Sequence, residues 1–189
     1  MANESTLAIQ TLLTARLFEP KDKSLMGDIE FLKAHPVTQY PKMWREIKSG
    51  RRRVVNRMIV TAYCEFLALM HQTETSVIGD FKYHHSGRGV GIEAVGNTLL
   101  GDPVENARDV GTQVAAGVTY TSVATTTYTA AIPVSPCPIT EHGLFSTAGA
   151  GGPPVTGGTL MDRSVFAAIN VVSGNQIEWT YVITFVAGG

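Results

Sequence analysis

Few residues in this chain have the types and spacing that catalysis needs. His142 lies four positions before Ser146, but the surrounding sequence lacks the strand–turn–helix context of a nucleophile elbow. Two carboxylates, Glu141 and Asp162, could form an acid–base pair, yet nothing in the sequence sets the distance between them. The favoured interpretation is an ion pair or an intersubunit contact between Glu141 and Asp162-Arg163. We therefore predict that the protein is not an enzyme.

Two adjacent histidines, His84 and His85, are the main candidates for metal ligands. Neighbouring side chains in an extended chain point to opposite faces, so the two rings are poorly placed to share one ion. No Cys, Asp or Glu follows at the usual ligand spacing. The glycine-rich loop expected at 84–91, which includes both histidines, lacks the Lys-Ser/Thr ending of a P-loop and the spacing of a dinucleotide fingerprint. We expect no metal and no cofactor.

A cluster of arginines, Arg51, Arg52, Arg53 and Arg57, is the candidate partner-binding site. It belongs to a basic region, because residues 1–57 hold 11 of the 15 Lys and Arg but only 6 of the 16 Asp and Glu. Such a run is typical of a solvated turn before a helix, or of a contact with an acidic neighbour. The formal net charge of -1 and the lack of interleaved aromatics indicate no specific nucleic-acid partner.

The middle of the chain is almost uncharged, since Glu141 is the only formal charge between Val110 and Met161. An uncharged, β-rich surface tends to associate, so this region favours a homo-oligomer or a docked partner. Cys64 and Cys137 are far apart in sequence and are expected to be unpaired. No signal peptide is visible, and the apolar run at 59–70 is shorter than the ~20 residues that span a bilayer. We expect a soluble protein made in the cytoplasm.

The segment 158–186 has the clearest period. Ile177, Trp179 and Tyr181 alternate with polar residues, which predicts a half-buried strand. A second apolar run at 164–172 precedes the turn residues 173–175, and the two runs predict a β-hairpin. Further strands are expected at 77–83, at 139–146 and twice within 110–134. The glycine- and proline-rich stretch 147–158 is expected to be a surface loop.

The first third of the chain has helical spacing instead. Apolar residues at 7, 9, 12, 13 and 17 predict a helix over 1–18 that ends at Pro20. Further helices are expected over 24–34 and from Pro41. The strongest pattern predicts a helix over 58–72 that covers one face of the sheet. We therefore divide the chain into a helical N-terminal segment, 1–73, and a β-domain, 74–189.

Three segments carry a resemblance to a known family: GDFKYHHSGRG at 79–89, ITEHGLFS at 139–146 and GGTLMDRSVFAAINVVSGNQIEWTYVITF at 157–185. Together they resemble small tailed-bacteriophage virion proteins. Those commonly carry a KxHxSGxG loop, a TExGLF strand and then GTLxxRxVFxAxNVxxGDxIxxTYxLT. The resemblance covers roughly 77–189 and leaves the first 72 residues uncovered. The chain departs from the pattern at Asn175, where Asp is common, and at 151–154, which would lengthen one loop.

The resemblance implies a virion structural protein without a cofactor. We expect a mainly β fold, an antiparallel β-sandwich of the jelly-roll-like kind with a helical N-terminal segment. The expected role is that of a capsid cement or decoration protein, a homo-oligomer, with a trimer favoured. Its partners would be the major capsid protein or other virion proteins, with no membrane, after synthesis in the host cytoplasm. The alternatives are a tail, neck or baseplate adaptor and a receptor- or glycan-binding module.

Overall fold

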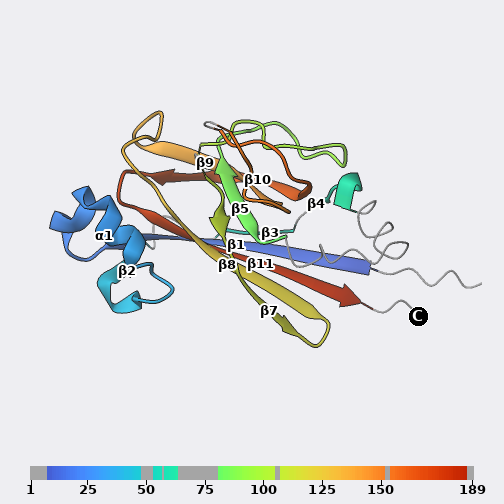
Figure 1. The fold of residues 1–189 in the computed structure, drawn as a ribbon, viewed down its shortest axis with the longest axis horizontal. Helices are drawn as coiled ribbons and strands as arrows, with labels where there is room; N and C mark the ends of the chain where they lie inside the picture. Colours follow the sequence, from blue (N-terminus) through green and yellow to red (C-terminus); the bar gives the residue numbers. More distant parts are fainter. Residues whose placement is uncertain are drawn as a thin grey trace, which may run out of the picture.

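The computed structural model describes residues 8–47, 53–56, 58–63, 81–104, 107–151 and 154–186. These residues form a mainly β structure of two antiparallel sheets, with short helices around α1 at one end and a single helical turn near β4 (Figure 1). The prediction of a mainly β protein is confirmed. The side chains between the sheets come from both of them, as in the cluster that joins Leu13 and Trp179 of one sheet to Ile139 and Ile169 of the other.

The first sheet is built around the last strand of the chain. Its strand order is β2-β1-β11-β8-β7, with β3 also paired to β1. In β11 the alternation gives one fully buried face of Ile177, Trp179 and Tyr181. The strands of this sheet are β1 (Ala8–Pro20), β2 (Trp44–Glu46), β3 (Arg53–Asn56), β7 (Thr112–Ala116), β8 (Thr119–Thr127) and β11 (Gln176–Val186).

The second sheet carries most of the buried polar side chains. Its strand order is β4-β10-β9-β5-β6. The strands are β4 (Met58–Ile59), β5 (Tyr83–Gly87), β6 (Asp109–Val110), β9 (Cys137–Phe145) and β10 (Leu160–Val171). The strands expected at 139–146 and within 110–134 are confirmed as β9, β7 and β8. Of the strand expected at 77–83, residues 77–80 lie outside the described residues, 81–82 form a turn, and Tyr83 begins β5, which includes both histidines.

The predicted hairpin at 164–186 is wrong in its pairing. Both strands and the turn exist: Gly174 has a φ of 85°, and the Asn175 N–H donates to the carbonyl of Val172. However, β10 pairs with β9 and β4, whereas β11 pairs with β1 and β8. The turn therefore connects the two sheets. The strands bury their apolar sides against each other, with the rings of Phe166 and Trp179 6.1 Å apart.

The helix predicted over 1–18 is also wrong, because Ala8–Pro20 is strand β1. This strand pairs with β11 from Ala8↔Val186 to Phe18↔Gln176. Leu13, Ala15 and Leu17 are all buried, so alternate residues face the core, as the two-residue period of a strand requires. Residues at 9, 13 and 17 fit a helical and an extended spacing equally well, and pairing with a long neighbouring strand favours the extended form.

The helices that do form are short. The helix expected over 24–34 is observed as two pieces, η1 (Lys23–Gly27) and α1 (Ile29–Ala34). Asp22 caps the first and Asp28 the second through their side-chain oxygens. The helix expected from Pro41 is a single turn, η2 (Pro41–Met43), and the chain then continues as β2. Trp44 of β2 is buried with Leu32 and Val37 in a small satellite core.

The remaining helix prediction, 58–72, is only partly within the described residues. Met58–Ile59 is strand β4, residues 61–63 are helical, and 64–72 lie outside the described residues. The predicted boundary between 73 and 74 lies outside them too and stays a prediction. The pairing of β1 with β11 does place the beginning of the first segment and the end of the second in one sheet.

Candidate functional site

Glu141, at the centre of β9, organises a buried polar network. Its Oε1 accepts hydrogen bonds from the backbone N–H of Gly89 at 2.9 Å and of Asp102 at 2.7 Å. Its Oε2 accepts from the N–H of Gly101 at 3.0 Å and from Arg163 Nε at 2.8 Å. One carboxylate thus ties β9, β10 and the 88–104 loop together. Glu141 is fully buried and Arg163 nearly so.

The strand register explains why this carboxylate fits. Glu141 lies between Gly87 of β5 and Val165 of β10. A Cβ atom at Gly87 would lie 2.5 Å from Glu141 Oε1, and one at Gly89 would lie closer still. Real Cβ atoms do not approach so closely, so the two glycines leave the space that the carboxylate occupies.

The charge of Glu141 is set by two opposing effects. Burial alone would raise its pKa. The N–H groups of Gly101 and Asp102, the Arg163 side chain and the Gly89 N–H outweigh burial, so the pKa of Glu141 is lowered. The pair is therefore a carboxylate and a guanidinium shielded from water. The predicted ion pair is confirmed, and its energetics are those of a buried pair, not of an exposed one.

The carboxylate pair considered from sequence does not form. Asp162 lies opposite Leu144 in the ladder, whereas Glu141 lies opposite Val165. Since side chains alternate between the faces of a sheet, Glu141 and Asp162 point to opposite sides of it. Ser146 is not paired with a base by any observed hydrogen bond either: its Oγ accepts from the Thr159 N–H at 2.9 Å.

The network holds a long loop, 88–104, against the outer side of the second sheet. Arg163 Nη1 donates to Asn97 Oδ1 at 3.3 Å, and Glu93 accepts a hydrogen bond from the Val165 N–H. At the base of the loop, Arg88 and Asp102 form an ion pair of 2.9 Å. The charged groups of the loop are therefore engaged with its own scaffold.

The same loop exposes large apolar side chains to solvent. The exposed fractions are 77% for Val90, 92% for Ile92, 58% for Val95 and 52% for Leu99. A loop that is anchored from below and apolar outside is typical of a protein-contact surface. From sequence, residues 92–100 fit either a short helical turn opened by Glu93 or an extended segment. Ile92, Val95 and Leu99 are visible there as apolar residues, but a sequence without a clear period does not show which side chains face solvent.

His84 and His85 lie in strand β5, not in a glycine-rich loop. His84 faces the first sheet: its Nδ1 is 3.1 Å from His142 Nε2 and its Nε2 is 2.8 Å from Ser122 Oγ. His142 also packs on Trp179, with ring centroids 4.5 Å apart. These rings connect the two sheets. No cluster of three or more His, Cys, Asp or Glu side chains suited to a metal ion occurs in the described ranges.

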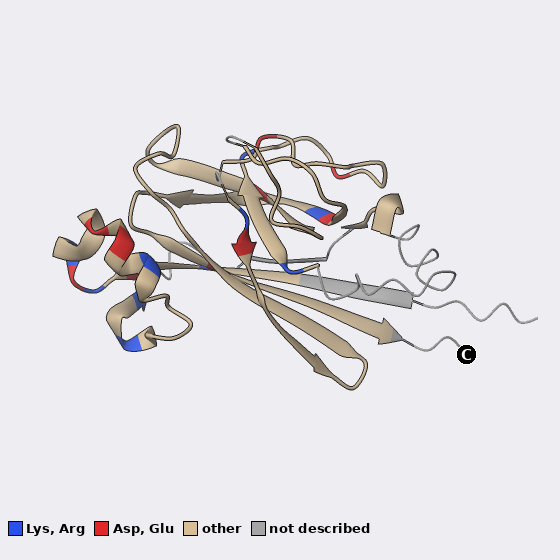
Figure 2. Cartoon of the chain, in the orientation of Figure 1, with Lys and Arg blue, Asp and Glu red and all other residues tan. Residues whose placement is uncertain are grey.

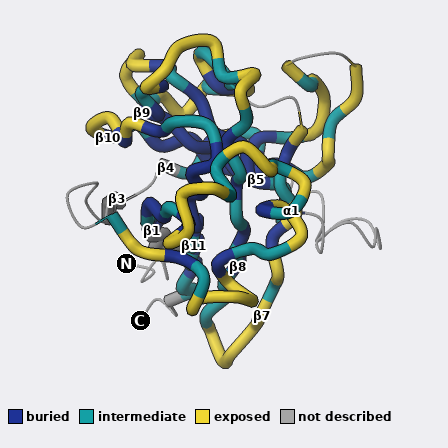
Figure 3. The backbone as a smooth tube through the Cα atoms, turned by 90° about the vertical axis from the view of Figure 1, so that its left-hand side faces the viewer, coloured by how far each residue is buried: buried dark blue, intermediate teal, exposed yellow. Residues whose placement is uncertain are grey.

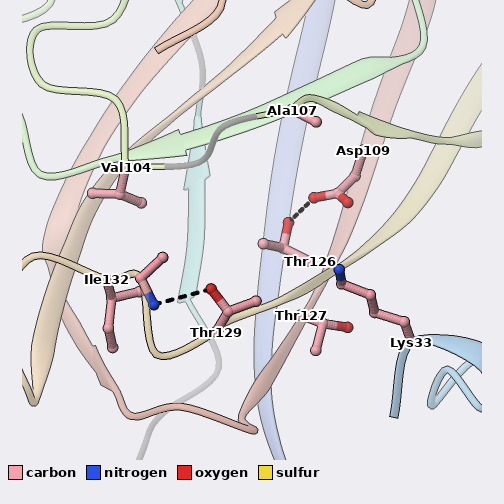
Figure 4. Close-up of a pocket in the computed structure, with 9 residues that line it drawn as sticks. Lys33, Val104, Ala107, Asp109, Thr126, Thr127, Thr129 and Ile132 are labelled. Carbon is pink, nitrogen blue, oxygen red and sulfur yellow. Dashed lines mark hydrogen bonds between the residues drawn. The ribbon is translucent and has the colours of Figure 1, made fainter. Parts of the chain in front are cut away.

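A small cavity with both polar and apolar walls lies beside Lys33 of α1 and Thr126 and Thr127 of β8 (Figure 4). Its volume is about 170 Å³, and its polar groups are the Asp109 carboxyl, the Lys33 ammonium and threonine hydroxyls. Burial raises the pKa of Asp109 to about 7, although the Thr126 hydroxyl, which donates to it, acts in the opposite direction. The cavity could hold a small polar group, but it lies away from the Glu141 network.

The predicted arginine cluster is largely beyond what the structure describes. Arg51, Arg52 and Arg57 lie outside the described residues. Arg53 begins strand β3, and its backbone pairs with Ala15 of β1. The expected role of the four arginines in binding a partner stays a prediction. Of the cysteines, Cys137 is buried in the core and Cys64 lies outside the described residues.

Comparison with known proteins adds no assignment. No family model, no curated protein and no solved structure matches the chain. Within the described residues, no helix is long and apolar enough to cross a membrane.

Proposed function

We propose that this protein is a structural component of a tailed-bacteriophage virion, a capsid cement or decoration protein that binds and stabilises the head shell. One observation carries the proposal. The residues that carry the resemblance are brought together in space: Gly87 and Gly89 of the first motif surround Glu141 of the second, which binds Arg163 of the third. These motif residues together form one buried network that stabilises the fold. A role in stability, without a reaction, is what we expect of a structural protein.

The fold we propose is an antiparallel β-sandwich of the jelly-roll-like kind. Its support is the core shared by the two sheets and the turn at 172–175, which carries the chain from one sheet to the other. Such double-sheet folds present loops on a rigid base. The chemistry of this chain would then be adhesion without catalysis, with no metal and no cofactor.

The proposed mechanism uses several weak contacts together. The apolar side chains of the 88–104 loop, Val90 and Ile92 above all, would pack on an apolar surface of the major capsid protein or another virion protein. The arginines Arg51, Arg52, Arg53 and Arg57 would lie on acidic capsid surface. Linked contacts act at high effective concentration, so a homo-oligomer would bind far more tightly than one copy. The protein would be located in the virion after synthesis in the host cytoplasm.

The copy number per purified particle tests this function. Quantitative mass spectrometry against the major capsid protein should give hundreds of copies for shell decoration. About a dozen would favour the second candidate, a tail, neck or baseplate adaptor. No copies would remove the virion function and leave the fold unchanged.

Substitutions separate the two proposed contacts. Alanine at all four arginines should weaken particle binding in low salt, and unchanged binding would exclude the basic segment. Ile92→Ser, at a side chain that is 92% exposed, should weaken binding at every salt concentration. The control is Val134→Ser, at an exposed valine outside the loop.

A receptor- or glycan-binding module is the further alternative, and one observation favours it. The 170 Å³ cavity at Asp109 combines a carboxyl, an ammonium and hydroxyl groups, which suit a small polyhydroxylated ligand. Against it, Trp179 is fully buried in the core, so it offers no stacking platform for a sugar.

A further inference from the structure

Strand β7 is an unprotected edge. Among the described strands it pairs only with β8, at the end of the first sheet. Four of its five residues are exposed, as the tube in Figure 3 shows. Edge strands of natural proteins are usually protected by lysines, prolines or bulges. Strand β7, with the sequence TQVAA, carries none of these, and the lower part of the sheet around it is free of charge in Figure 2.

The backbone of β7 has hydrogen-bonding groups that point away from the sheet. A two-residue turn with Gly117 at a φ of 58° joins β7 to β8, so the closing pair Ala116↔Thr119 exchanges hydrogen bonds. Antiparallel ladders alternate, so Val114 also bonds to β8. The N–H and C=O groups of Gln113 and Ala115 consequently point outward, where a further strand could bind them.

The side chains of this edge are self-complementary. The sequence from Val110 to Val118, VGTQVAAGV, has nearly the same character in both directions about its centre. A two-fold axis through Val114 would place Val114 opposite Val114 of a second copy, and Gln113 opposite Ala115. It would place Thr112 opposite Ala116, and Val110 beside Val118. No like charges would meet, and an isologous interface requires such symmetry of a surface with itself.

Three exposed valines lie along this edge: Val114 within β7, Val110 in β6 just before it, and Val118 in the turn just after it. Val110, Val114 and Val118 are 63%, 58% and 62% exposed. Val110 and Val114 line a cavity of about 550 Å³, whose other wall includes Lys33 of α1 and residues 36–39. In the two-fold arrangement, Val118 of the second copy would lie beside Val110, at this cavity. The pairing would therefore bury apolar side chains as well as satisfy backbone groups.

We propose that two copies of this protein pair through β7, antiparallel about a two-fold axis at Val114, and join their first sheets into one continuous sheet. The occupant of the edge is a second copy because the register places Val114 opposite Val114, leaves every residue of β7 opposite an uncharged one and pairs the outward backbone groups of Gln113 with those of Ala115. This deepens the self-association included in the proposed function. It predicts an even-numbered assembly, in place of the trimer favoured from sequence.

Disulfide trapping tests the register. Opposed residues in a non-hydrogen-bonded pair have Cα atoms about 4.5 Å apart, within reach of a disulfide. Val114→Cys should therefore give a covalent dimer on mild oxidation, seen on a non-reducing gel. Thr112→Cys is the matched control on the same strand. In the proposed register the two copies of residue 112 are four positions apart, about 13 Å, and should not cross-link. Equal cross-linking of both variants would overturn the register.

The mass in solution tests the pairing itself. Multi-angle light scattering should give twice the mass of one chain for the native protein, or an even multiple of it. Ala115→Pro removes an outward N–H that the isolated chain does not use, so the protein should fold but have half the mass. Ala115→Ser keeps this N–H and should retain the dimer. Circular dichroism and the urea midpoint confirm that each variant is folded.

Three outcomes would overturn the proposal. They are a monomeric native protein, a trimeric mass, and a dimer that survives Ala115→Pro. A monomer would instead favour a strand of another protein at the edge. Failure of the virion function is distinguishable, because a dimer with no copies in purified particles would leave the pairing standing. Hundreds of copies in the particle of a protein that is monomeric in solution would support the virion function and exclude the pairing through β7.

Discussion

Glu141→Gln is the sharpest test of the buried network. The amide keeps the size of the side chain but removes the negative charge, and its NH₂ group would face an N–H donor. Arg163, 4% exposed, would keep its positive charge without its counter-ion. Breaking a buried pair in this way costs about 3–5 kcal/mol. With a urea slope of about 2 kcal/mol per M, the unfolding midpoint should fall by roughly 2 M.

Urea unfolding followed by tryptophan fluorescence measures this loss, since Trp44 and Trp179 are both buried. The control is Glu30→Gln, which removes a carboxylate whose partner, Lys33, is 3.3 Å away on the exposed side of α1. Exposed pairs contribute about 0–1 kcal/mol, so this midpoint should hardly move. If Glu141→Gln lowers the free energy of unfolding by less than ~1 kcal/mol, the pair contributes no more than an exposed one and the argument is refuted.

The dependence on pH provides an independent test of the same carboxylate. The pKa of Glu141 is lowered in the folded state, so the folded protein holds this proton less tightly than the unfolded chain. The resulting stability is present above the ordinary pKa of about 4.5 and is lost as pH falls through the lower, folded value. The native protein should lose this part of its stability in acid, and Glu141→Gln should not.

Three further substitutions address other parts of the structure. The pKa of Asp109 is raised to about 7 in the folded protein, so the unfolded chain gives up this proton more readily. The free energy of unfolding should therefore decrease by about 1–3 kcal/mol as pH rises from 5 to 8. Asp109→Asn should remove this decrease. Urea titrations at several pH values measure it, and an unchanged slope would contradict the prediction. Gly89→Ala should cost ~2–3 kcal/mol through overpacking, whereas Gly91→Ala, with open space around its Cα, should leave the melting temperature nearly unchanged. Tyr128→Phe should cost about 1 kcal/mol, since it removes the 3.0 Å hydrogen bond between its hydroxyl and Ser86; a neutral result would mean that this bond contributes nothing.

The strands could be predicted where the period was unambiguous. In β11, large apolar residues alternate with polar ones, and the buried face matches. In β1 the leucines at 12, 13 and 17 fit a helix as well, and only the eleven residues paired with β11 resolve the choice. The hairpin prediction failed for a related reason. A tight turn shows that two strands are connected, but not whether they lie in one sheet or in two.

The candidate site was predictable only in part. The proximity of Glu141 and Arg163 was expected from sequence, but the three backbone N–H groups that complete the shell come from residues 89, 101 and 102. Irregular loops have no period, so their path cannot be read from side-chain patterns. The histidine contacts between sheets depend in the same way on tertiary packing, because His84 and His142 lie on different strands, β5 and β9.

The pairing of β1 with β11 also constrains how the chain can be made. Residues 21–175 lie between these strands, and at ~5–20 residues per second a ribosome needs roughly 8–30 s to add them. Throughout that interval β1 has no β11 to bind, and its apolar residues are held by no native partner on that side. The first sheet can close only after translation has reached β11. Until then β1 lacks its longest partner, so the partly made chain has an unpaired strand edge, a feature that favours aggregation.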